Sequence, residues 1–116
     1  MITALAFVIA AAAGAVARAE AGRRWNRHDG IAVGTLMVNI TGSFLLGLLA
    51  ETTGPTLTVV GVGALGAYTT FSSFARDVVA LGRARQYSLV GLYVAATYGL
   101  GIAAAAVGVA ISSGPR

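Results

Sequence analysis

The segment GAYTTFSSFARD, residues 66–77, places polar chemistry inside an otherwise apolar stretch of the chain. Its seven consecutive positions from 68 to 74 carry five hydroxyl side chains and the two phenylalanines Phe71 and Phe74. Hydroxyl side chains compete for backbone hydrogen bonds and, together with Gly66, favour a break in a helix. The carbonyl groups freed by a break can hold a cation, and the freed amides can face an anion.

The two phenylalanines suggest which kind of solute the segment could serve. In a helix that follows the break, Phe71 and Phe74 lie three residues apart on one face. An aromatic ring has a positive edge, so two rings presented edge-on among hydroxyl and amide donors would attract a small anion. Such binding is weak enough for the anion to leave again. In the alternative interpretation both rings face lipid or fill the core, and the residues alone leave both interpretations open.

The composition indicates an integral membrane protein. The chain has 116 residues, of which 57% are hydrophobic and 10% charged, and its mean hydropathy is +0.81. A soluble domain carries about 25% charged residues. Four apolar stretches, residues 2–18, 31–50, 57–81 and 87–111, approach the roughly 20 residues of a helical membrane span. The first could also be a secretory signal, but it lacks a positively charged start and three further spans follow.

These stretches predict an all-α membrane protein in which residues 1–116 form a single domain of four transmembrane helices, with the third helix broken in mid-membrane. There is no cysteine, which excludes disulfides and cysteine metal sites. The single histidine, His28, lies in a charged loop and offers no cluster of metal ligands.

The arginines predict how the chain sits in the membrane. All eight basic residues are arginines, and seven of them lie in the segments 18–27 and 76–85. The opposite side carries only Arg116. Basic loops stay in the cytoplasm, so both termini are expected outside. Because the arginines cluster between apolar runs, they favour lipid headgroups over nucleic acid as the partner.

Polar side chains also form stripes at i, i+4 and i+8 in two of the spans. The stripes are Thr35, Asn39 and Ser43 in the second span, and Tyr93, Thr97 and Gly101 in the fourth. Such stripes join neighbouring helices through hydrogen bonds in many membrane proteins. They could equally line a pathway, and the spacing does not decide between these two interpretations.

The combination of GTLMVNITGSF with TTFSSF, at this separation and chain length, resembles the Fluc (CrcB) family of bacterial fluoride channels over essentially the whole chain. The resemblance implies a passive, fluoride-selective channel in the bacterial plasma membrane that exports cytoplasmic fluoride and relieves its toxicity. It also implies an antiparallel dimer with two pores along the subunit interface, with fluoride and membrane lipid as partners.

The resemblance assigns roles residue by residue. The positions that match the family's fluoride path are Phe71, Phe74, Asn39, Thr35, Ser73, Tyr93 and Thr97. Arg18 matches a basic residue near the pore vestibule. The backbone carbonyl groups of Gly66 and Thr69 match those that hold a structural sodium ion at the dimer interface.

The chain departs from the family pattern at three positions. Thr97 stands where serine is usual, Asp77 where glutamate is usual, and Ala67 where a second glycine is common. The first change keeps the hydroxyl group and adds a methyl group that narrows the path. The last alters the expected geometry of the helix break.

The arginine bias bears on the dimer partner. An antiparallel homodimer needs each chain to insert both ways, whereas seven arginines against one favour a single orientation. We therefore expect a related, oppositely oriented subunit as the partner. The antiparallel homodimer is the alternative, because a few residues can set topology.

Other functions fit the sequence less well. A small multidrug exporter needs an ionisable residue buried in the membrane, and the first span, ITALAFVIAAAAGAVA, contains none. A subunit that completes a heterodimeric fluoride channel without conducting itself remains an alternative. We expect no enzyme, because no nucleophile and base pair, metal cluster or cofactor loop is present in the sequence.

Overall fold

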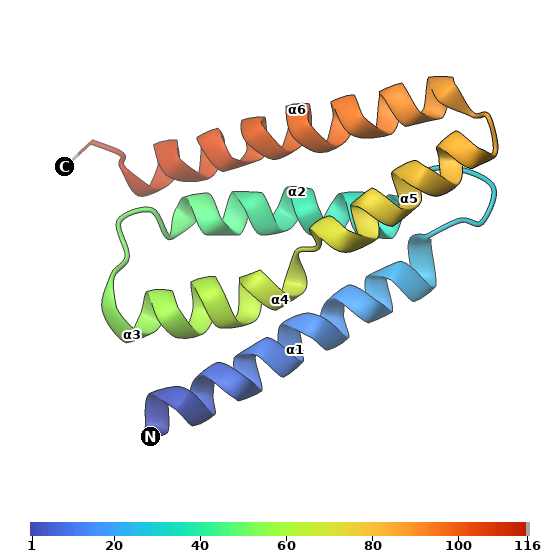
Figure 1. The fold of residues 1–116 in the computed structure, drawn as a ribbon. Coiled ribbons are helices and arrows are strands. Elements are labelled where there is room, and N and C mark those ends of the chain that lie inside the picture. The colour runs from blue at the N-terminus through green and yellow to red at the C-terminus, as the bar shows by residue number, and fades with distance from the viewer. Residues whose placement is uncertain (116) are drawn as a thin grey trace.

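The computed structural model describes residues 1–115 and shows a chain built of helices (Figure 1). The elements are α1 (Ile2–Trp25), α2 (Val33–Leu48), α3 (Gly54–Thr56), η1 (Leu57–Leu65), α4 (Gly66–Tyr68), α5 (Phe71–Arg83) and α6 (Tyr87–Ser112). The segments α3, η1 and α4 follow one another without interruption, and α5 continues from them after a bend. The chain therefore has four helical units, of which the third is bent.

Three of these units are long and apolar enough to cross a membrane: Ile2–Trp25, Gly54–Arg83 and Tyr87–Ser112. Helix α2 is shorter, with 16 residues, or about 24 Å at a rise of about 1.5 Å per residue. The apolar stretch 31–50 is longer than this helix at both ends. Ala32 forms an isolated β-bridge with Asn26, and Leu49 caps the end of the helix before a turn.

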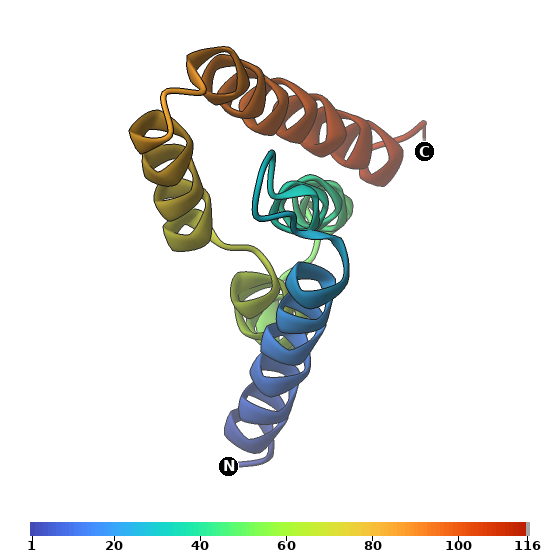
Figure 2. The same cartoon turned by 90° about the vertical axis from the view of Figure 1, so that its right-hand side faces the viewer.

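Helix α2 lies at the centre of the packing. Figure 2 shows it between α6 on one side and α1 with the η1–α4 segment on the other. Helix α5 diverges from this arrangement and packs mainly against α6. The molecule is consequently flat, with principal extents of 47 × 35 × 19 Å. Few side chains are fully enclosed by this single chain, and Tyr93 and Val38 are the largest of them.

Glycines allow the helix backbones to approach closely. A Cβ atom on Gly14 would collide with the Ala64 carbonyl oxygen of η1, and one on Gly108 would collide with the Phe44 carbonyl oxygen of α2. A backbone atom cannot move aside as a flexible side chain can. These contacts are typical of membrane helices, whose association depends on close packing because lipid chains are as apolar as the helices.

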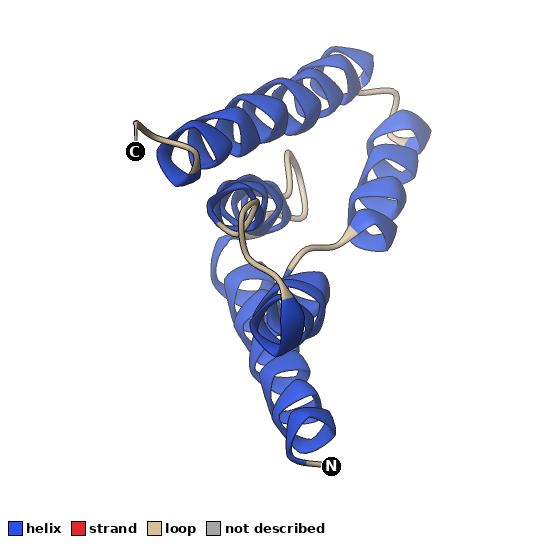
Figure 3. Ribbon diagram, turned by 90° about the vertical axis from the view of Figure 1, so that its left-hand side faces the viewer, coloured by secondary structure: helices blue, strands red, loops and turns tan. Residues whose placement is uncertain are grey.

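The helix interruption expected in the third span lies at Thr69 and Thr70. Both residues have extended backbone, with φ −80° and ψ 158° at Thr69 and φ −151° and ψ 119° at Thr70. Figure 3 shows this short loop between two helical segments. The Thr70 hydroxyl accepts a hydrogen bond from the Ser73 N–H group at 3.1 Å and so caps the start of α5.

The nine residues of η1 are π-helical, which the apolar pattern of this stretch did not predict. Short π-helical stretches inside helices occur frequently at functional sites. The backbone is therefore irregular both in η1, before the break, and at the break itself.

Both arginine-rich connections lie at the same end of the molecule. Figure 1 shows the α1–α2 and α5–α6 connections at one end, and the N-terminus, the α2–α3 connection and the end of α6 at the other. Arg116, the arginine predicted to lie on the opposite side, is outside the described residues. The two basic loops therefore lie at one end of the molecule, as the positions of the arginines predict.

We predict that Gly14→Ala lowers the stability of the protein, because the added methyl group forces α1 away from η1. Overpacking of this kind costs about 1–3 kcal/mol. Gly91→Ala in α6 is the matched control, since its new Cβ atom would meet nothing within 4 Å. Thermal unfolding in detergent should show a lower midpoint for Gly14→Ala alone. Equal midpoints for the two variants would contradict the close contact.

Candidate functional site

A groove of about 390 Å³ lies beside the helix break. It is lined by α2, by the break and the first turn of α5, and by the middle of α6. The described residues of its lining include hydroxyl, amide and aromatic side chains but none that is charged. The lining residues used below are Asn39, Ser43, Thr69, Thr70, Phe71, Phe74, Thr97 and Tyr98.

The side chain of Asn39 holds the break in its extended conformation. The Thr70 N–H group donates to Asn39 Oδ1 at 2.7 Å, and Asn39 Nδ2 donates to the Thr70 carbonyl oxygen at 3.0 Å. Because a backbone N–H group can only donate, this pair fixes which end of the amide is oxygen. One N–H of the Asn39 amide is used in the pair, which leaves the second N–H for another acceptor.

At the break, two backbone carbonyl groups lack the N–H donors that a continuous helix would give them. In an unbroken α-helix the N–H groups of residues 70 and 73 would bond to the carbonyl oxygens of Gly66 and Thr69. Here the Thr70 N–H group bonds to Asn39, and the Ser73 N–H group bonds to the Thr70 hydroxyl. Gly66 and Thr69 are the two residues whose carbonyl groups the family resemblance implies as ligands of a sodium ion.

Phe74 is the centre of an aromatic cluster. Its ring centroid lies 6.0 Å from that of Phe71, 5.2 Å from that of Tyr93 and 5.9 Å from that of Tyr98. The ring planes of Phe74 and Tyr98 make an angle of 85°, which is an edge-to-face contact. Phe74 is 6% exposed and Phe71 is 71% exposed. The two phenylalanines therefore share the groove, but one is enclosed and the other is open.

Most hydroxyl groups in the groove are already used within the protein. Ser43 donates to the Asn39 carbonyl oxygen at 2.7 Å, and Thr69 donates to the Leu65 carbonyl oxygen at 3.0 Å. Within residues 1–115, the buried side-chain oxygen that lacks any partner is Thr97 Oγ1. An unpaired buried hydroxyl is costly, so a ligand that accepts its hydrogen would be favoured here.

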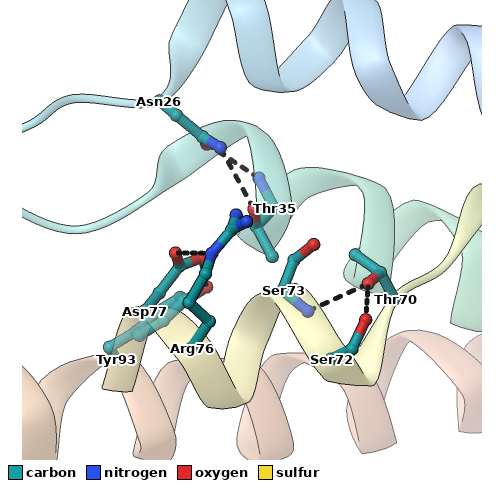
Figure 4. A network of polar contacts seen from close by, with 8 residues as sticks. All are labelled: Asn26, Thr35, Thr70, Ser72, Ser73, Arg76, Asp77 and Tyr93. Carbon is teal, nitrogen blue, oxygen red and sulfur yellow. Dashed lines mark hydrogen bonds and ion pairs between the residues drawn. The ribbon is translucent and has the colours of Figure 1, made fainter. Parts of the chain in front are cut away.

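A second polar cluster, formed by Asn26, Thr35, Asp77 and Tyr93, lies nearer the arginine-rich loops (Figure 4). The fully buried Tyr93 donates its hydroxyl hydrogen to Asp77 Oδ2 at 3.2 Å. The side-chain amide of Asn26 forms two hydrogen bonds with Thr35, one to its hydroxyl group and one from its backbone N–H group. The exposed Arg76 lies 3.8 Å from the Asp77 carboxylate.

A cavity of about 360 Å³ lies at this arginine-rich end. Asn26 and Asp77 line it together with Arg27, His28 and Arg76. Unlike the groove, this cavity carries charges of both signs.

The structure places the predicted site residues in different parts of the molecule. The groove brings together Asn39, Thr69, Phe71, Phe74 and Thr97. Thr35 and Tyr93 belong instead to the second polar cluster, where both are buried. Ser73 lies in the first turn of α5, Gly66 begins α4, and Arg18 is half-buried on α1 and lines neither cavity.

Three residues that the fold brings to these sites were not predicted from the sequence as site residues. Thr70 could have been found, since a threonine three residues before Ser73 is a helix-capping spacing. Tyr98 follows Thr97 directly, so it lies outside the polar stripe to which Thr97 belongs. Asn26 lies in a charged loop nine residues before Thr35, and no helical period connects the two positions.

Comparison with known proteins gives the family. Residues 5–109 match the family described as CrcB-like protein, Camphor Resistance (CrcB). This match covers nearly all of the chain. The chain belongs to the CrcB family.

Curated members of the CrcB family align with most of the chain. It is 35% identical over 114 residues to fluoride-specific ion channel FluC 2 of Rhodococcus jostii, covering 97% of this chain and 100% of the relative. It is 36% identical over 120 aligned positions to FluC of Rhizobium etli, covering 96% of both chains. FluC 1 of Geobacillus kaustophilus is 42% identical over 83 residues, which cover 68% of this chain and 72% of that protein. The predicted family is confirmed.

We predict that Asn39→Leu destabilises the protein by leaving the N–H and carbonyl groups of Thr70 without partners. Each unsatisfied buried group costs about 1–3 kcal/mol. Ser43→Ala is the control on the same helix, because its hydroxyl bonds only to the carbonyl group one turn earlier. Unfolding in detergent should show a clear loss for Asn39→Leu and little change for Ser43→Ala. A stable Asn39→Leu variant would mean that the break does not depend on this amide.

Proposed function

We propose that this chain forms a passive fluoride-selective channel that carries fluoride out of the cytoplasm. The observation that carries the proposal is the groove, where uncharged hydrogen-bond donors and aromatic rings surround a path with no fixed cation. Family membership and the name fluoride-specific ion channel, borne by the curated relatives, support the identity of the ion.

The donors available in the groove suit a small anion. The second N–H of the Asn39 amide and the hydroxyl of Thr97 can both donate to it, and the rings of Phe71 and Phe74 can offer their positive edges. A fixed cation would hold an anion tightly, whereas conduction requires binding that is weak enough for exit. Flux then follows the fluoride gradient and the membrane potential without coupling to another reaction.

The remaining predicted residues extend this path. We place Ser73, Thr35 and Tyr93 between the groove and the arginine-rich end, and Arg18 near the vestibule. The buried polar cluster around Tyr93 supports this order, because Phe74 lines the groove and packs directly on Tyr93.

A structural sodium ion fits the carbonyl groups of Gly66 and Thr69. Both have lost their helical donors to Asn39 and to the Thr70 hydroxyl. Carbonyl oxygens at a helix break are suitable ligands for sodium. In a dimer, two such pairs would meet at the subunit interface and hold the ion there.

An antiparallel dimer would complete the site. Phe71 lines the groove and yet is 71% exposed in the single chain, and both α1 and α6 present long apolar faces. The partner is a related, oppositely oriented subunit, with a second copy of this chain as the alternative. In a bacterial plasma membrane the two basic loops would face the cytoplasm and both termini the outside.

The first test is fluoride efflux from liposomes that contain this chain alone, measured with a fluoride electrode and a potassium ionophore. Rapid efflux of fluoride but not chloride would establish the channel and the homodimer together. Efflux only after addition of a second family member from the same organism would establish the heterodimer. An absence of fluoride efflux in both cases would contradict channel function for this chain and favour the role of a non-conducting partner subunit.

Phe71→Ile and Phe74→Ile should each abolish most of the fluoride flux, because isoleucine fills a similar space without a positive ring edge. Size-exclusion chromatography in detergent should show that both variants still form the wild-type assembly. Wild-type flux in both variants would rule out the ring edges as the groups that contact fluoride.

Thr97→Val should lower the flux, because it removes the unpaired hydroxyl of the groove while keeping the shape of the side chain. The loss of one hydrogen bond to an ion, about 1.5–3 kcal/mol, corresponds to tenfold or more. Thr97→Ser retains the hydroxyl and should conduct at least as fast as the wild type. Equal rates for valine and serine would show that this hydroxyl does not serve the ion.

A further inference from the structure

The amide of Asn26 has a fixed orientation in this fold. The Thr35 N–H group donates to Asn26 Oδ1 at 3.0 Å, and a backbone N–H group can act only as a donor. The nitrogen Nδ2 must therefore face the Thr35 hydroxyl, and it does so at 3.2 Å. An amide NH₂ group has no acceptor capacity, so the Thr35 hydroxyl oxygen accepts this bond.

This bond decides where the hydrogen of the Thr35 hydroxyl can point. Since the oxygen accepts from Asn26, the hydroxyl hydrogen is directed away from Asn26. The Thr35 side chain is buried, at 4% exposure, in the same polar cluster as Tyr93 and Asp77 (Figure 4). Tyr93 in turn gives its own hydrogen to Asp77. One hydrogen bond of the cluster therefore runs from Asn26 to Thr35 and another from Tyr93 to Asp77, and the hydrogen of Thr35 is left for a further acceptor.

The cluster lies between the groove and the cavity at the arginine-rich end. Phe74 lines the groove and contacts Tyr93, while Asn26 and Asp77 line the cavity at the arginine-rich end. Under the proposed function, an anion that moves between the groove and this cavity would pass this cluster. There it needs hydroxyl hydrogens, because an oxygen lone pair or the Asp77 carboxylate would repel it.

We propose that Asn26 is a positioning residue for anion conduction, which turns the hydroxyl hydrogen of Thr35 toward the passing anion. This inference rests on the proposed function. Asn26 itself does not contact the ion. It acts through Thr35, and its amide rather than a carboxylate is required because only the amide can donate to the Thr35 oxygen.

Asn26→Asp tests this inference with a minimal change. The carboxylate still accepts the Thr35 N–H group, so the connection to α2 is kept, but its second oxygen can only accept. The Thr35 hydroxyl then turns its hydrogen toward residue 26 and away from the path. We expect fluoride efflux to fall about tenfold, the effect of one lost hydrogen bond to an ion. Thr35→Val should cause a similar loss, and Thr35→Ser should conduct like the wild type.

The double variants separate positioning from the added negative charge. If Asn26 acts through Thr35, Asn26→Asp should cause no further loss in the Thr35→Val background but a full loss in the Thr35→Ser background. An equal fold-change in all backgrounds would overturn the inference, and so would wild-type flux in Asn26→Asp. If Asn26→Asp does not fold, Asn26→Ala enters the same cycle, with the same expected dependence on the Thr35 hydroxyl.

The assay uses whichever form conducts, this chain alone or paired with its relative. A wild-type protein that does not conduct in either form would overturn the proposed function and this inference with it. A conducting wild type with an unchanged Asn26→Asp variant would overturn the inference alone.

Discussion

The two hydrogen bonds between Asn39 and the backbone of Thr70 are the interaction on which the rest of this structure depends. A broken helix leaves backbone groups that cannot remain unsatisfied in an apolar environment. Asn39 satisfies the N–H and carbonyl groups of Thr70 from the neighbouring helix. The Thr70 hydroxyl then caps α5 and sets the direction in which Phe71 and Phe74 leave the break. One amide on α2 therefore holds the break that lines the groove.

The rest of the polar chemistry divides into groups used for the fold and groups left for a ligand. Ser43 and Thr69 donate to their own helices, whereas Thr97 keeps a buried hydroxyl without a partner. Asn39 has an orientation fixed by a backbone N–H group, so its remaining N–H group points in a defined direction. Fixed donors of this kind can stabilise an anion without a cationic side chain and without reorganisation as it passes.

The chain exposes much apolar surface although its helices pack closely. Glycines such as Gly14 and Gly108 bring helix backbones into contact, and the molecule as a whole is thin. Phe71 lines the groove and is largely exposed. Lipid covers apolar side chains, but it supplies no hydrogen bonds or ring contacts to a polar groove. The exposed groove is thus the part of the surface where the proposed second subunit would pack.

The sequence by itself determined the membrane class, the family, the helix break and the types of residue that line the groove. These features depend on composition and on short motifs such as TTFSSF, whose chemistry is local. Only the tertiary structure decided which partners each polar group has. Thr35 and Asn39 share one helical stripe, yet Thr35 binds Asn26 and Asn39 binds Thr70, 31 residues away. Such pairings depend on how separate helices cross, and no spacing along the chain encodes that geometry in a form that can be predicted from periodicity alone.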